Sequence, residues 1–303
     1  MVILVLNCGS SSIKYQVIDM EPSSSKLLAK GIVERIGLPE GDLVHKPVGK
    51  ENFELHQPIP DHTTGIKLVL DALTAPAHGV IASLDEVKAV GHRVAHGGEF
   101  FPESCIVTED AKEKIRSLFE IAPLHNPANL EGVLSIEKVL PGVPQVTVFD
   151  TSFHQTIPAV NYMYALPHAY YDKYRVRKYG FHGTSHKYVA QVGAELAGLD
   201  FHNSKIITCH IGNGASVTAI LNGKSFDTSM GFSPLDGLVM GTRCGSVDAS
   251  AITFIGEKEG MTYAQLNDMM NKKSGVLGIS DISSDMRDID RAYDEGNPRA
   301  ILA

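Results

Sequence analysis

Two segments with the same pattern, a strand, a polar turn and a second strand, constrain the fold of this 303-residue chain more than any other feature. The first covers residues 2–19. It opens with an apolar run at residues 2–6, typical of a strand buried on both faces, and continues with the rough alternation of a second strand at 13–19. The second segment, residues 205–221, repeats this order about one domain length later. The pattern predicts an internal repeat, although two unrelated hairpins would produce the same similarity.

The chain length predicts two domains, because a domain typically has about 100–200 residues. We place the boundary near residue 150, with an N-terminal lobe at 1–150 and a C-terminal lobe at 151–303. Helices are expected at 66–73, at 111–121 after the N-cap Thr108, along Leu130, Val133, Leu134 and Leu140, along Tyr188, Val189, Val192 and Leu196, and at 263–273 after a capping box. Strands are expected at 87–94 and 145–149, with short ones between 21 and 60, and Asn222-Gly223 predicts a type I′ turn.

Composition excludes several classes of protein. The formal net charge is −8 and the isoelectric point about 5.9, which disfavours a nucleic-acid binder or a binder of anionic membranes. Four cysteines occur without a CxxC pair or zinc-type spacing, so we expect reduced thiols. No apolar run approaches the roughly 18 residues of a membrane span, and the N-terminus lacks the basic flank of a signal peptide. These features predict a cytoplasmic protein.

The turn between the first two strands is a candidate phosphate site. Asn7, Gly9 and three serines precede Lys14, and together they offer an open backbone, hydroxyl groups and one ammonium to phosphoryl oxygens. The turn is not a Walker A loop, since GxxxxGK[ST] is absent and a strand rather than a helix follows. Taken alone, it is equally consistent with an ordinary serine-containing hairpin.

Other candidate residues stand at strand ends and in glycine-flanked turns. Arg93 follows His92 on a predicted strand and is a planar donor suited to carboxylate or phosphate, although a solvated surface arginine is the plain alternative. His92 and His96 cannot share a metal ion there, because four residues of strand span roughly 13 Å. Asp150 ends a buried strand, which is where open α/β sheets bind ligands. His182 and Arg243 lie in glycine-flanked turns, and residues 210–214 form a second polar turn. Hydrolase motifs such as GxSxG and HExxH are absent, as are the motifs of protein kinases.

Taken together, these motifs resemble the acetate kinase family (acetokinases), and the similarity covers essentially the whole chain. The matching stretches are Leu4-Val5-Leu6-Asn7-Cys8-Gly9-Ser10-Ser11-Ser12-Ile13-Lys14, Val90-Gly91-His92-Arg93-Val94-Ala95-His96-Gly97-Gly98, Leu124-His125-Asn126-Pro127, Phe149-Asp150-Thr151, Phe181-His182-Gly183-Thr184-Ser185-His186, His210-Ile211-Gly212-Asn213-Gly214, Gly241-Thr242-Arg243 and Asp285-Met286-Arg287. The resemblance implies an α/β fold of two related lobes with an interlobe cleft, shared with actin, sugar kinases and heat-shock chaperone ATPases.

The resemblance also implies the reaction: the γ-phosphoryl group of ATP moves to acetate, giving ADP and acetyl phosphate, with Mg²⁺ and in a homodimer. By resemblance, Arg93 holds the carboxylate, while His182 and Arg243 stabilise the charge on the transferred group. Asn7 lies near the metal. The ATP site is formed by Lys14, His210, Ile211, Gly212, Asn213, Gly214, Asp285, Met286 and Arg287. We expect Arg93 and Arg243 to face one gap between the lobes.

The family assigns proton transfer to Asp150, but a simple carboxylic acid is already ionised at neutral pH. We therefore expect Asp150 to orient an arginine or a metal-bound water instead.

Two positions depart from the family pattern. Ala95 stands where a branched aliphatic residue usually lines the acyl pocket, so propionate is an alternative substrate. The chain also stops at Ala303, before the Gly-rich adenosine loop and the late glutamate of the family, and we expect it to be poorly active. A non-catalytic nucleotide switch of the same fold is a further alternative, although a switch has no need of an acyl-binding arginine.

Overall fold

The computed structural model describes residues 1–21 and 24–303. They fall into two compact units, Met1–Ser152 (unit 1) and Phe153–Ala303 (unit 2). Within the described ranges, no helix has the length and apolar character needed to cross a membrane. All four cysteines are free, as predicted.

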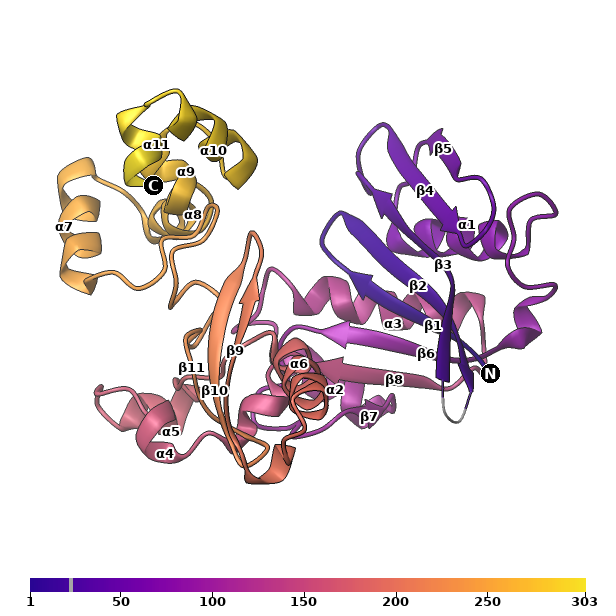
Figure 1. Ribbon diagram of the computed structural model, residues 1–303, viewed down its shortest axis with the longest axis horizontal. Coiled ribbons are helices and arrows are strands. Elements are labelled where there is room, and N and C mark those ends of the chain that lie inside the picture. The colour runs from indigo at the N-terminus through magenta and orange to yellow at the C-terminus, as the bar shows by residue number, and fades with distance from the viewer. Residues whose placement is uncertain (22–23) are drawn as a thin grey trace. The chain divides into compact units, whose positions relative to one another are not determined.

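Unit 1 is built on a mixed sheet (Figure 1). Its strands are β1 (Val2–Cys8), β2 (Ser12–Glu21), β3 (Ser24–Glu34), β4 (Gly41–Pro47), β5 (Phe53–Gln57), β6 (Val87–Val94), β7 (Cys105–Ile106) and β8 (Gln145–Phe149), and its helices are α1 (His62–Thr74), α2 (Glu109–Ser117) and α3 (Asn126–Val139). Among the described residues this sheet has eight strands in the order β5-β4-β3-β2-β1-β6-β8-β7. The predicted strands at both sides of the first turn and at 87–94 and 145–149 are confirmed. Residues 22–23, within the stretch expected to hold short strands, lie outside the described part.

The apolar run of the first strand predicted that both of its faces would be buried. This prediction is wrong, because only one face is covered. Val2, Leu4 and Leu6 are buried, whereas Val5 is 37% exposed. Helices α1 and α3 pack against each other and against the buried face of the sheet. Apolar residues on the open face of β1 mislead a reading based on hydrophobicity alone, because the run has no polar residue to reveal its alternation.

Parallel pairing brings three strand ends together. β1 pairs in parallel with β6, and β6 in parallel with β8, so the carboxyl ends of all three strands lie at one edge of the sheet. The buried Asn129 of α3 ties two of these ends to the helix: its Nδ2 donates to the carbonyl oxygen of Cys8 over 2.6 Å, and its Oδ1 accepts from the Ala95 amide over 2.9 Å. Gly132 on the same helix allows the close approach, since a Cβ there would stand 2.5 Å from Cys8 Sγ.

Helix α2 begins as predicted but ends early. Thr108 is its N-cap and accepts a hydrogen bond from the Ala111 amide over 3.2 Å. The helix ends at Ser117 rather than near residue 121. The Leu118 amide donates to the Ile115 carbonyl, an i→i−3 bond that tightens the last turn.

Unit 2 has a smaller sheet. Its described strands, β9 (Lys205–Ile211), β10 (Ala215–Leu221) and β11 (Lys224–Thr228), form an antiparallel sheet of three in the order β11-β10-β9. Its helices are α4 (Ala159–Tyr162), α5 (Ala169–Tyr174), α6 (Gly183–Leu196), α7 (Ala249–Glu259), α8 (Tyr263–Lys272), α9 (Gly275–Ser280), α10 (Met286–Asp294) and α11 (Pro298–Leu302). Positive φ angles at Asn222 (51°) and Gly223 (78°) confirm the predicted type I′ turn, and Thr262 and Gln265 form the predicted capping box.

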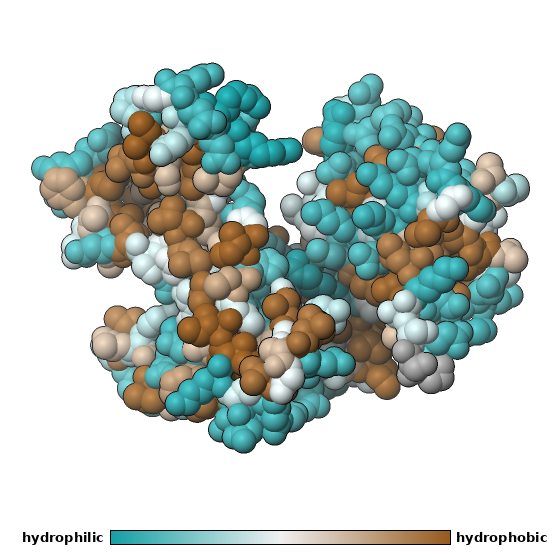
Figure 2. Space-filling model, viewed as in Figure 1, coloured by the Kyte–Doolittle hydropathy of each residue, from teal (hydrophilic) through white to brown (hydrophobic). Residues whose placement is uncertain are grey.

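Helix α6 forms where predicted, but its buried side is a different one. The expected apolar face is open: Tyr188 is 66% exposed and Leu196 84%. The helix packs on β9 with Gly183, His186, Ala190 and Ala194. Three of these four residues are glycine or alanine, which take up little space between a helix and a sheet. Apolar side chains consequently gather on the surface over β9 and α6 (Figure 2).

We predict that Asn129→Ala destabilises unit 1. The variant leaves the Ala95 amide and the Cys8 carbonyl without their protein partner, and an unsatisfied buried group costs about 1–3 kcal/mol. The free energy of unfolding, measured by urea denaturation, should fall by about 2–6 kcal/mol for the two groups together. Asn203→Ala, at an exposed position, should stay within about 0.5 kcal/mol. Equal losses in the two variants would contradict the role assigned to Asn129.

Candidate functional site

Three predicted site residues meet at the edge of the unit 1 sheet. Arg93 at the end of β6 forms a two-point ion pair with Asp150, which follows β8: Nε donates to Oδ1 over 2.9 Å and Nη2 to Oδ2 over 2.6 Å. The third contact comes from β1, where Asn7 Oδ1 accepts from Arg93 Nη1 over 3.2 Å. The guanidinium is therefore oriented by one strand end on each side of its own strand.

The ion pair combines a buried carboxylate with a partly open cation. The Asp150 side chain is 5% exposed and the Arg93 side chain 44%. Burial alone would lower the pKa of Arg93, but the attraction and hydrogen bonds of Asp150 outweigh it and raise the pKa. Arg93 thus remains a cation and still presents part of its surface to an anionic ligand.

Two buried histidines flank Arg93 and stay neutral. Burial lowers the pKa of both His92 and His96 to about 4. His92 Nε2 donates to Gln145 Oε1 over 2.7 Å, which leaves the lone pair on Nδ1, a buried atom with no hydrogen-bond partner in the described structure. A proton on Nδ1 would therefore find no acceptor. These histidines shape the core around the arginine and add no charge to it.

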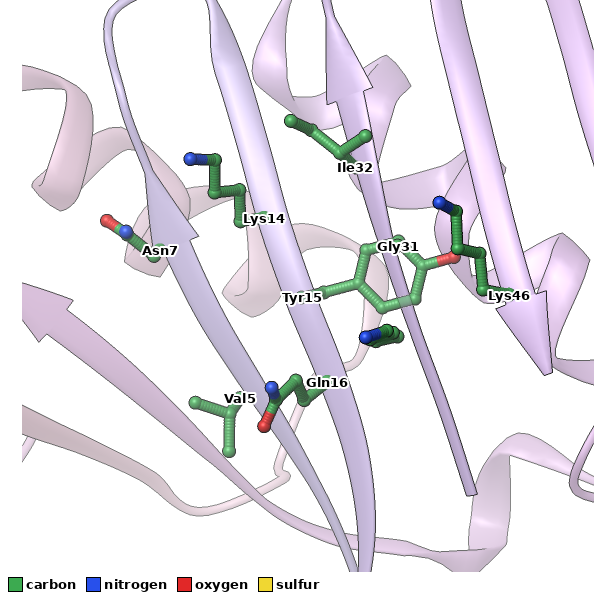
Figure 3. A pocket seen from close by; sticks show the side chains of 9 residues that line it. Val5, Asn7, Lys14, Tyr15, Gln16, Gly31, Ile32 and Lys46 are labelled. Carbon is green, nitrogen blue, oxygen red and sulfur yellow. The ribbon is translucent and has the colours of Figure 1, made fainter. Parts of the chain in front are cut away.

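Lys14 lies beside Asn7 in the register of the first hairpin and borders a hollow of about 390 Å³ on the open face of the sheet (Figure 3). Lys30 and Lys46 also border this hollow, and they are directly opposite each other on β3 and β4. Like charges directly opposite each other on neighbouring strands repel. The predicted phosphate residue is thus part of a locally cationic surface within a chain of net charge −8.

A second cluster lies in unit 2. His182 is the N-cap of α6 and adopts a left-handed conformation with φ of 60°. A Cβ placed on Gly214 would stand 3.4 Å from Arg243 Nη1 and 3.8 Å from His182 Nε2, so both side chains converge on this glycine. Arg243 Nη1 donates to the Pro234 carbonyl over 3.2 Å. Burial lowers the pKa of Arg243 below its ordinary value.

His210 of β9 stacks on His182, with ring centroids 4.0 Å apart. The structure therefore groups His210 with His182 rather than with the cavity that the neighbouring predicted residues line.

That cavity, of about 840 Å³, joins two motifs far apart in the sequence. Residues 211–213, from the turn after β9, line it together with residues 285–287 at the start of α10. Asp285 accepts from Arg287, through both the side chain and the backbone, which lowers the pKa of Asp285 to about 2. The volume lies in the usual range for small-molecule sites, roughly 300–1,000 Å³.

Sequence reasoning missed several residues at these sites. Leu238, Val239, Met240, Val276 and Ser284 line the unit 2 cavity, and no motif marked them. Ser216, which contacts His182, was not marked by any motif either. Ser216 matters because β10 places it against the histidines of α6, and the spacing of residues along the chain does not predict this contact.

Comparison with known proteins identifies the family. Residues 2–303 match the model of the acetokinase family. The chain is 54% identical over 304 residues to an acetate kinase of Caldanaerobacter subterraneus subsp. tengcongensis, covering 100% of this chain and 75% of that protein. It is 55% identical over 303 residues to an acetate kinase of Heliobacterium modesticaldum, covering 100% and 76%.

Solved structures agree. The acetate kinase of Porphyromonas gingivalis superimposes with a TM-score of 0.95 at 49% identity, covering 99% of this chain and 75% of that one. A propionate kinase from Francisella tularensis subsp. tularensis SCHU S4 gives 0.92 at 41% identity, again covering 99% and 75%. The fold is thus the two-lobe α/β fold that the resemblance implied. The chain belongs to the acetokinase family.

We predict that stability falls as the pH drops from about 6.5 towards 4. In the unfolded chain, histidine takes up a proton near pH 6.5, whereas folded His92 and His96 resist it down to about pH 4. Proton uptake in this window therefore favours the unfolded state, by about 2 kcal/mol for each histidine at pH 5. Urea denaturation of His92→Gln should show a smaller loss between pH 7 and pH 5. The exposed-site control His202→Gln should behave like the parent chain, and an unchanged pH slope in His92→Gln would contradict the prediction.

Proposed function

We propose that this chain is a phosphotransferase that moves the γ-phosphoryl group of ATP to the carboxylate of acetate, giving acetyl phosphate and ADP, reversibly and by direct in-line transfer. The observation that carries the proposal is the match to the acetokinase family over residues 2–303, with relatives named acetate kinase at 54% and 55% identity. The geometry of each unit supports it separately.

In unit 1, Arg93 binds the carboxylate. Its guanidinium is a planar fork that fits two carboxylate oxygens better than an ammonium does. Asp150 and Asn7 hold this fork in one orientation, so less freedom is lost when the acid binds. Lys14 contributes positive charge for phosphate oxygens.

Asp150 acts by orientation rather than by proton transfer. Acetate, a simple carboxylic acid, is already ionised at neutral pH, and its attacking oxygen has no proton to lose. Both Asp150 oxygens also accept from Arg93, an arrangement that supports the positioning role expected from the sequence.

In unit 2, His182 and Arg243 stabilise charge on the transferred group, because phosphoryl transfer depends mainly on positioning and electrostatic stabilisation. Asn213 and Gly214 offer donors to the nucleotide phosphates, alongside Gly212, Ile211 and His210. Asp285, Met286 and Arg287 border the same cavity as residues 211–213 and hold the nucleoside side.

Magnesium fits as a metal held mainly by substrate. In the described residues no group of three His, Cys, Asp or Glu side chains forms a metal cage. Mg²⁺ bound to nucleotides usually takes one or two protein oxygens and completes its shell with phosphate oxygens and waters. Asn7, which the resemblance places near the metal, provides such an oxygen at the end of β1. When bound, the ion neutralises charge on the phosphates.

The proposal includes a cytoplasmic location and a homodimer. The acidic composition and four free cysteines support the former. The latter rests on the family resemblance. Nucleic acid and membrane are not among the proposed partners.

Propionate kinase activity is the second candidate. Ala95 directly follows β6, two residues after Arg93, and is smaller than the branched residue expected by resemblance. The structural similarity to a propionate kinase, with a TM-score of 0.92, makes this alternative worth testing.

We predict that Arg243→Ala lowers acyl phosphate formation by about 10³–10⁵, the range found for arginines that stabilise phosphoryl transfer. Arg93→Ala removes the partner of the acetate carboxylate and should also lower it. Hydroxylamine trapping of acyl phosphate, with ATP and acetate, propionate or butyrate, measures both rate and substrate choice. Arg116→Ala, on the exposed side of α2, is the matched control and should keep the parent rate. Full activity in both site variants would overturn the assignment.

We predict that Ala95→Val weakens propionate use more than acetate use. A pocket discriminates one methylene by only about 1–3 kcal/mol, so the ratio of the two kcat/KM values should change by about 10- to 200-fold. Equal effects on both acids would show that Ala95 does not border the acyl group.

A further inference from the structure

A chain of buried hydrogen bonds runs from the unit 2 sheet to His182. Ser216 Oγ on β10 lies 2.8 Å from His182 Nδ1 and 2.7 Å from His186 Nε2. The other nitrogen of His186, Nδ1, lies 2.7 Å from Thr208 Oγ1 on β9. Ser216 is 0% exposed, His186 1% and Thr208 5%. Water is therefore excluded from the hydroxyls and the ring that link β9 to His182.

The chain admits only two proton arrangements. Ser216 has one hydroxyl proton, so it donates to one imidazole and accepts from the other. If Ser216 donates to His182 Nδ1, the proton of a neutral His182 is on Nε2. His186 Nε2 then donates to Ser216, and Thr208 donates to His186 Nδ1. In the other arrangement every donation reverses and His182 carries its proton on Nδ1.

The proposed role of His182 in phosphoryl transfer requires the first arrangement. The Nε2 edge of His182 faces Gly214, where Arg243 Nη1 also converges. Both tautomers are uncharged, but only the one with its proton on Nε2 can donate from that edge to a phosphoryl oxygen. His154 and His210 are further titratable groups beside this chain of hydrogen bonds. Burial, followed by repulsion from the neighbouring histidines, lowers the pKa of His186 to about 3. His186 therefore stays neutral and keeps one N–H to donate.

We infer that Ser216 and His186 are positioning residues for His182: Thr208, His186 and Ser216 donate in sequence and hold the His182 proton on Nε2. This inference rests on the proposed function, because the phosphoryl oxygens proposed beside Gly214 are what require a donor on His182 Nε2. The chain fixes both the ring plane and the tautomer through Ser216, His186 and Thr208, to which the proposed function gives no substrate contact.

Nitrogen-15 NMR of the histidine-labelled full chain, with His182 assigned by comparison with His182→Gln, tests the inference directly. At a pH where His182 is neutral, the parent chain should show a protonated Nε2 and an unprotonated Nδ1. Ser216→Ala removes the donor to Nδ1, and the Nδ1–H form should then become populated. Ser216→Cys keeps a donor at this position but a weaker one, and it should shift the signals in the same direction but less. This variant keeps the test available should Ser216→Ala fold poorly.

The matched control is Thr218→Val, which removes a buried hydroxyl two residues further along β10. Thr218 bonds Thr228 over 2.8 Å and no histidine, so the His182 signals should not move. Unchanged His182 signals in both Ser216 variants, or a parent chain with the proton on Nδ1, would overturn the inference.

Kinetics separates this inference from the proposed function. In Ser216→Ala, kcat for acetyl phosphate formation should fall by up to about 100-fold, as misplacement of a catalytic group does. KM for acetate, which depends on Arg93 in unit 1, should stay unchanged. A tautomer shift without any loss of kcat would uphold the positioning chain and show that the proposed role of His182 is wrong.

Discussion

Unit 1 depends on the parallel alignment of β1, β6 and β8. Because parallel strands end at the same edge of a sheet, residues from three distant parts of the sequence meet there without any loop to guide them. Asn7, Arg93 and Asp150 are the result: a cation held from both sides, with one buried carboxylate opposite it. The same alignment lets α3 bond to two strand ends through Asn129, so the stability of the fold and the orientation of Arg93 have a common origin.

In unit 2, hydrogen bonds to a buried hydroxyl take the place of the ion pair that orients the site residue of unit 1. The cationic residue of the unit 2 site, Arg243, lies on a loop. The imidazole ring of His182 beside it bonds to the buried hydroxyl of Ser216 rather than to a charged partner. Neutral histidines suit this purpose, because each can donate and accept at once and adds no charge next to the arginine. Burial explains why they stay neutral in both units: His92, His96 and His186 all have lowered pKa values.

Much of the architecture was predictable from local patterns. The first hairpin, the Asn222-Gly223 turn and the Thr262 capping box were correct because each depends on residues that lie close together in the chain. The errors occurred where a distant contact decides the outcome. Val5 is apolar but 37% exposed, and α6 buries its small residues rather than Tyr188 and Leu196. The early end of α2 is a local detail that propensity does not resolve.

The sequence by itself determined the class of fold, the motifs and, through their resemblance, the family, because hydrophobic period, turn chemistry and residue type are properties of short segments. Only the tertiary structure decided how the motif residues are used. It pairs Arg93 with Asp150, brings residues 211–213 and 285–287 to one cavity, and places Ser216 between two histidines. Such pairings depend on strand order and on which faces pack together, and these follow from the balance of contacts over a whole unit rather than from any single segment.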